Sequence, residues 1–68
     1  EKTALIFKAI HTLPESQKVI FILAKIDGKS YQEIVEITGR SLSSVESILF
    51  RAKKNLQKKL ENFYRNNQ

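Results

Sequence analysis

Residues 30–47 have the sequence SYQEIVEITGRSLSSVES, and this stretch decides the fold. Two short runs with helical apolar periodicity, EIVEI and SVESIL, begin within it on either side of Gly39-Arg40-Ser41. Ser30 and Glu33 have the spacing of a capping box, in which two side chains satisfy each other's backbone N–H groups at a helix start. Gly39 favours a sharp turn, because only glycine adopts left-handed geometry at little cost. The stretch therefore predicts a short helix, a tight turn and a second helix that Ser41 caps.

Upstream of this stretch, the sequence predicts two more helices. We expect the first over about residues 3–11 and the second from Pro14 to Gly28, a natural left-handed end for a helix. Thr12 and Glu15 also have the capping-box spacing. The buried side of the second helix is expected to consist of Val19, Ile22, Leu23 and Ile26.

The third and fourth helices differ greatly in length. The inner side of the short third helix is expected to hold Tyr31, Ile34, Val35 and Ile37. The fourth should run about 30 Å, with a buried side made of Leu42, Val45, Leu49, Ala52, Leu56, Leu60 and Phe63. No strand pattern is present, so residues 1–68 are expected to form one all-α, four-helix, helix-turn-helix domain with a long C-terminal recognition helix.

Length and composition exclude several classes of protein. A chain of 68 residues builds only a modest core, which leaves little stability for a catalytic cleft, so no enzyme is expected. With no Cys and one His, neither a disulfide framework nor a metal site is expected, and no cofactor is implied. The apolar run at 19–24 is far shorter than the roughly 20 residues of a membrane span. Because the chain begins with Glu1, we expect a fragment of a longer protein.

Positive charge is concentrated in the C-terminal part of the chain. Residues 1–39 carry five Lys and five acids, whereas residues 40–68 carry seven bases and two acids. The whole surplus of +5 therefore lies after the predicted turn. This asymmetry indicates a polyanionic partner, either nucleic acid or an anionic membrane surface, although a solvated helix face has the same composition.

The outer face of the fourth helix favours nucleic acid. At about 100° per residue, the side opposite Val45 starts with small hydroxyl residues and continues with basic side chains. Small hydroxyl residues let a helix approach base edges or phosphates closely. This face holds Ser43, Ser47, Phe50 and Lys54, with Glu46 and Arg51 at its flanks and Lys58 further along. Glu46 either sits near the helix N-terminus for the macrodipole or accepts a hydrogen bond from a cytosine amino group. Phe50 either touches a thymine methyl group or is covered by another protein.

Two stretches resemble region 4 of bacterial sigma factors of the extracytoplasmic function (ECF) group. They are LPESQKVIFILAKIDGKSYQEIVEITG and SLSSVESILFRAKKNLQKKL, which lie within residues 13–60. The resemblance implies a cytoplasmic protein of transcription initiation that recognises the minus-35 promoter element in double-stranded DNA. It also implies docking on the β flap of RNA polymerase and, in many members, inhibition by an anti-sigma protein.

The DNA-binding positions that we expect combine the resemblance with the outer face described above. Glu46 and Ile48 depart from the family pattern, since these positions are frequently basic in the family. Lys18 stands where the family often has Arg. The expected set is Lys18, Arg40, Ser41, Ser43, Ser44, Glu46, Ser47, Phe50, Arg51, Lys54 and Lys58.

Other interpretations of the same features stay open. The helix-turn-helix domain of response-regulator transcription factors shares the middle of the pattern but lacks the C-terminal motif formed by residues 51–54. A module that acts mainly by binding an anti-sigma protein or polymerase would use Phe50 and the long helix differently. A membrane-surface helix is disfavoured, because Leu56, Leu60 and Phe63 are needed to cover the core.

Overall fold

The computed structural model describes residues 2–66, with side chains for residues 3–65. Its helices are α1 (Lys2–His11), α2 (Glu15–Phe21), α3 (Tyr31–Thr38) and α4 (Leu42–Asn66), and a π-helical turn η1 (Ile22–Ile26) extends α2. No strand occurs within residues 2–66. The predicted all-α, four-helix arrangement is therefore confirmed, with the second helix made of α2 and η1 together.

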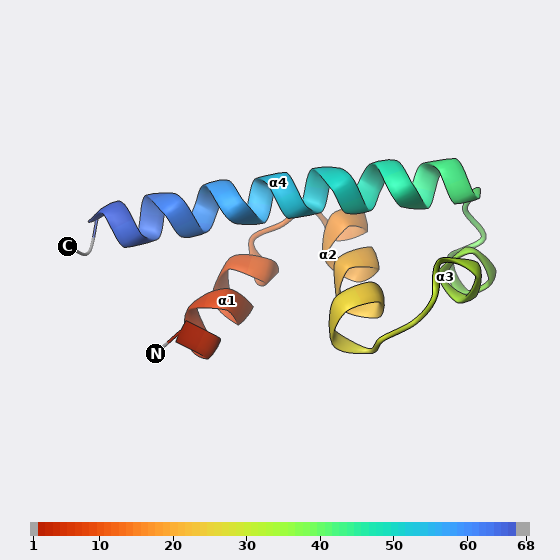
Figure 1. Ribbon diagram of the computed structural model, residues 1–68, viewed down its shortest axis with the longest axis horizontal. Helices are drawn as coiled ribbons and strands as arrows, with labels where there is room; N and C mark the ends of the chain where they lie inside the picture. Colours follow the sequence, from red (N-terminus) through yellow and green to blue (C-terminus); the bar gives the residue numbers. More distant parts are fainter. Residues whose placement is uncertain (1, 67–68) are drawn as a thin grey trace.

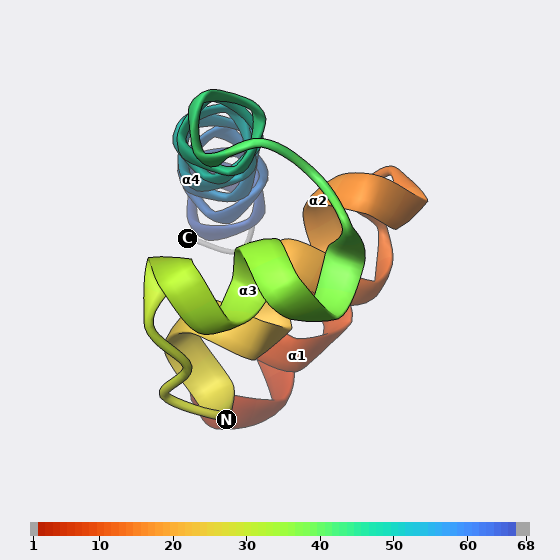
Figure 2. The same cartoon turned by 90° about the vertical axis from the view of Figure 1, so that its right-hand side faces the viewer.

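The long α4 runs along one side of the molecule, and the other helices lie against it (Figure 1). α1 and α2 approach its middle from the same side, while α3 crosses beneath its N-terminal end. The view along α4 shows all three shorter helices on one side of it (Figure 2). This arrangement leaves the opposite side of α4 uncovered over its whole length.

The core lies where α1, α2 and α3 meet the inner side of α4. Ile20, Ile34 and Val45 come from three different helices and are each at most 1% exposed. The remaining buried residues are Ile10, Leu13, Phe21, Leu49, Ala52 and Leu56. Val45, Leu49, Ala52 and Leu56 confirm the predicted spacing on α4, whereas Leu42 is 48% exposed because it precedes the part of α4 that reaches the core.

The predicted buried side of the second helix is partly wrong, because only Ile22 and Leu23 of its four residues pack against the core. Ile20 and Phe21 are buried there, whereas Val19 and Ile26 are 40% and 48% exposed. Residues 19–24 are all apolar, so the sequence pattern could not select one face. In addition, the Asp27 N–H donates to the Ile22 carbonyl five residues back, and this wider turn departs from the 3.6-residue period on which the prediction relied.

The caps are partly as predicted. Ser30 and Glu33 form the capping box, with the Ser30 N–H donating to Glu33 Oε1 at 2.8 Å and the Glu33 N–H to Ser30 Oγ at 3.1 Å. Thr12 does not cap α2, because the chain is still turning at the end of α1 and its hydroxyl donates to the Ala9 carbonyl at 2.6 Å. Pro14 is the N-cap residue of α2 and not its first helical residue.

The inner side of α3 is narrower than predicted. Ile34 is fully buried and Val35 half-buried, but Tyr31 and Ile37 are 41% and 57% exposed. α3 has only eight residues, and these two lie at its ends, about 60° to either side of Ile34. Ile34 therefore anchors α3 in the core, with Val35 packed against it.

Candidate nucleic-acid interface

The turn between α3 and α4 is fixed by hydrogen bonds within the chain. Gly39 has φ of +73° and its N–H donates to the Val35 carbonyl, as predicted for a left-handed helix end. The Arg40 N–H donates to Thr38 Oγ1 at 3.3 Å. The Ser44 N–H donates to Ser41 Oγ at 3.1 Å, which confirms Ser41 as the cap of α4. These bonds hold the N-terminal end of α4 in one direction relative to α3.

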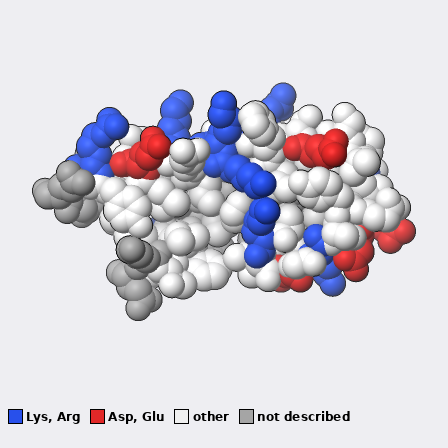
Figure 3. Space-filling view, in the orientation of Figure 1, with Lys and Arg blue, Asp and Glu red and all other residues white. Residues whose placement is uncertain are grey.

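The uncovered face of α4 carries most of the predicted DNA-binding residues. Its exposed members are Ser43, Glu46, Ser47, Phe50, Arg51, Lys54 and Lys58. Ser44 is half-buried beside the cap, and Ile48 is half-buried and packs against the core. Figure 3 shows basic side chains standing along the outer edge of α4. The structure thus brings small hydroxyl residues and bases together on one face.

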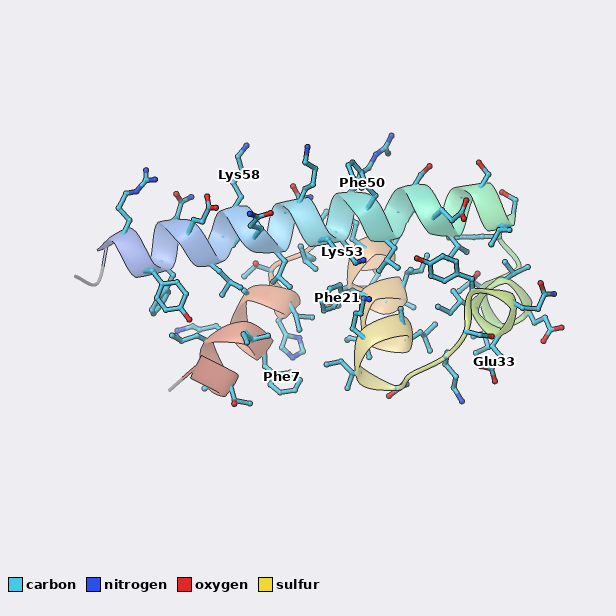
Figure 4. The ribbon with its side chains drawn as sticks, viewed as in Figure 1. Phe7, Phe21, Glu33, Phe50, Lys53 and Lys58 are labelled. Carbon is cyan, nitrogen blue, oxygen red and sulfur yellow. The ribbon has the colours of Figure 1, made fainter. Side chains whose placement is uncertain are left out.

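Phe50 points away from the other helices, as does Lys58 (Figure 4). The Phe50 side chain is 60% exposed, and the Lys54 ammonium lies over its ring at 5.3 Å from the centroid. A cation–π contact at an exposed site is worth about 0.5–1 kcal/mol. The pair therefore favours one position of the Lys54 charge on the outer face without burying the ring.

Lys18 and Arg40 lie outside α4. Lys18 is half-buried on α2 and pairs with Glu15 at 3.3 Å. Next to it, Gln17 accepts a hydrogen bond from Asn55 Nδ2 at 2.8 Å, which ties this part of α2 to α4 beside Lys54. Arg40 is exposed in the turn and lines one surface hollow with Glu15. Both bases therefore lie beside the outer face of α4, near Glu15, and not on it.

A second surface on α4 was missed by the sequence prediction. A shallow, mainly apolar groove of about 530 Å³ is lined by Phe21, Lys25, Lys53, Leu56, Gln57, Leu60, Glu61 and Tyr64. Lys53 points toward Phe21, away from the side that Phe50 occupies (Figure 4). The sequence pattern indicated that Leu56 and Leu60 are apolar and inward. It gave no sign that the packing of α2 against α4 leaves Leu60 and Tyr64 beside it partly uncovered.

The described residues offer no site for a metal ion and no membrane span. Within residues 2–66, no group of three or more His, Cys, Asp or Glu side chains is placed to hold an ion. In the same range, no helix is both long and apolar enough to pass through a bilayer.

The short α3, the fixed turn and the long α4 with an uncovered polar face define a helix-turn-helix domain. Residues 3–56 match the family model described as "Sigma-70, region 4". The chain belongs to this family. This match favours the sigma-factor interpretation over the response-regulator one.

The relatives with similar sequences are ECF sigma factors. The ECF RNA polymerase sigma-E factor of Haemophilus influenzae is 34% identical over 61 residues, which are 90% of this chain and 32% of that protein. The sigma-E factors of Salmonella typhimurium and Escherichia coli are each 33% identical over 61 residues, with the same coverage. The chain therefore spans about a third of the length of the curated relatives it matches, and the ECF resemblance is confirmed.

Proposed function

We propose that this domain recognises the minus-35 element of promoters by placing the N-terminal half of α4 in the major groove. The observation that carries the proposal is the uncovered face of α4, which has serines first and bases behind them and contributes nothing to the core. The major groove, about 12 Å wide, admits one helix. The other three helices all lie on the opposite side of α4 (Figure 2), so they leave this approach open.

The residues on this face divide by the part of DNA that they reach. Ser43 and Ser47 are short enough to let the backbone of α4 approach the base edges, and Phe50 supplies an apolar contact for a thymine methyl group. The bases Arg51, Lys54 and Lys58 recur further along α4, where a helix leaving the groove passes the phosphates. Arg40 and Lys18 extend this positive surface on the side of α2, where both lie near Glu15, and Ser41 and Ser44 hold the helix start near a phosphate.

Within the longer protein, we expect the domain to act by binding and not by catalysis. The family and the names of the sigma-E relatives support a role in transcription initiation with RNA polymerase. Because bacterial transcription takes place in the cytoplasm, we expect the protein there. Residues 1–68 would then form one domain of that protein, and an anti-sigma protein would act by covering it.

The apolar groove favours a second role for the same domain, namely docking on RNA polymerase. It shares no residue with the proposed DNA-binding set, and its lining includes the bases Lys25 and Lys53. A helix or loop with apolar side chains and nearby acids fits such a groove. The resemblance to region 4 suggests the β flap as the occupant, so DNA and polymerase would bind at the same time.

The test compares bases on different faces of α4 in the full-length protein. We expect Arg51→Ala and Lys54→Ala each to weaken binding to every duplex sequence, because phosphate contacts carry no sequence information. Lys53→Ala is the matched control, since it removes one charge from the same exposed helix but on the groove side. Equal effects of Lys53→Ala and Lys54→Ala, measured by fluorescence anisotropy, would contradict the proposed face.

A further inference from the structure

Glu46 is an acid within a face that otherwise holds hydroxyl groups, an aromatic ring and bases. It is exposed, and at about 100° per residue it lies about 60° from Ser43 and about 40° from Phe50. It therefore stands beside the residues that we place in the major groove.

Among residues 3–65, no local interaction accounts for an acid at this position. α4 begins at Leu42 and has no acid in its first turn, so Glu46 lies one residue beyond the region where the helix macrodipole favours negative charge. The residues three and four positions away on either side are Leu42, Ser43, Leu49 and Phe50, none of which is a base that could form an intrahelical pair. In the described part of the chain, the ion pair found is Lys18 with Glu15.

On DNA, an unpaired carboxylate in this position is unfavourable. It is repelled by the phosphates, and it loses water without gaining a donor. In the major groove, the donors are the N4 amino group of cytosine and the N6 amino group of adenine. On adenine, the neighbouring N7 acceptor repels the second carboxylate oxygen, so the favoured partner of an acid is cytosine.

We propose that Glu46 is a specificity-determining residue that accepts a hydrogen bond from the N4 amino group of a cytosine in the promoter element. This inference rests on the proposed function, because it requires α4 in the major groove. It goes beyond that function by naming the base that this chain selects at one position.

The experiment is a selection of bound duplexes from a randomised pool at one fixed salt concentration, using the full-length protein assembled with RNA polymerase. We expect the wild type to prefer cytosine at one position by about tenfold. Glu46→Gln should change that preference to adenine, since Gln bonds adenine N6 and N7 together. Glu46→Ala should abolish the preference at that position alone. Glu36→Gln, which removes the same charge from an exposed site on α3 that lies in neither proposed surface, should keep the wild-type pattern.

The outcomes separate this inference from the proposed function. If the Glu46 variants bind duplexes with the wild-type base preferences at every position, the role of Glu46 is overturned while DNA recognition stands. If the wild type enriches no duplex at all, the proposed function fails and the inference with it. Loss of folding does not confuse the result, because Glu46 is exposed and Gln and Ala are good helix formers.

Discussion

At the scale of single residues, the capping box at the start of α3 links protonation to stability. The backbone N–H of Ser30 holds the pKa of the Glu33 carboxyl below its ordinary value of 4.5; the Ser30 side chain and Lys29 add to this, while burial acts against it. A carboxyl with a lowered pKa in the folded state stabilises the fold above its unfolded pKa. That contribution is lost as the pH falls through the folded pKa.

Glu33→Gln should therefore lower the free energy of unfolding near neutral pH, because the amide keeps a hydrogen bond but loses the charge. The difference from the wild type should shrink as the pH falls below 4.5, where the wild-type carboxyl itself becomes protonated. Urea unfolding between about pH 7 and pH 3 measures this difference in the free energy of unfolding. Glu36→Gln, on the same exposed side of α3 but outside the box, is the control. A difference that stayed constant over this range would contradict the account.

Single residues also show which features could be predicted from the sequence. Ser30, Glu33, Gly39 and Ser41 were predicted correctly because a cap or a left-handed turn depends on residues that are neighbours in sequence. Thr12 matched the same spacing, but the end of α1 competed for its hydroxyl. Where α1 ends therefore decides the partner of the Thr12 hydroxyl, and the local residue spacing does not define that boundary.

At the scale of elements, Gly39 determines how α3 leads into α4. Its φ is +73°, and an added Cβ would meet nothing within 4 Å, so the cost of a side chain is conformational. Gly39→Ala should lower the free energy of unfolding by about 1–2 kcal/mol. Gly39→Asn should cost less, because asparagine adopts this conformation more readily. Urea unfolding of both variants checks the order, and an Ala variant as stable as the wild type would contradict it.

The helices also show which features could not be predicted from the sequence. The long α4 was predicted well because apolar residues recur on one side among polar ones. The second helix was not, since its apolar run has no polar side to define a face, and the π-helical turn η1 alters the period. The groove beside Leu60 and Tyr64 depends on where α2 meets α4, which is a tertiary property.

At the scale of the whole molecule, α4 carries two separate surfaces along a body 42 Å long. The outer face of its N-terminal half is polar and basic, and the groove beside its C-terminal half is apolar. All of the net charge of +5 comes from residues 40–68. One helix can therefore meet DNA and a protein partner together.

Tyr64 tests this separation, because it lines the groove and is 43% exposed. In the full-length protein, Tyr64→Ser should weaken binding to RNA polymerase by about tenfold, as expected for an interface aromatic, and leave duplex binding unchanged. Arg51→Ala should have the opposite pattern. Both affinities are measured by titration with polymerase or DNA. A loss of both affinities in Tyr64→Ser would contradict two independent surfaces.

The central claim, that the basic outer face of α4 binds DNA phosphates, is tested most directly by titrating duplex DNA at a series of salt concentrations. The logarithm of the binding constant should fall linearly with the logarithm of salt concentration, by about 0.9 for each phosphate contact. Arg51→Ala and Lys54→Ala should each reduce that slope by about one contact, and Lys53→Ala should not. An affinity independent of salt, or a slope unchanged in Arg51→Ala and Lys54→Ala, would contradict the account.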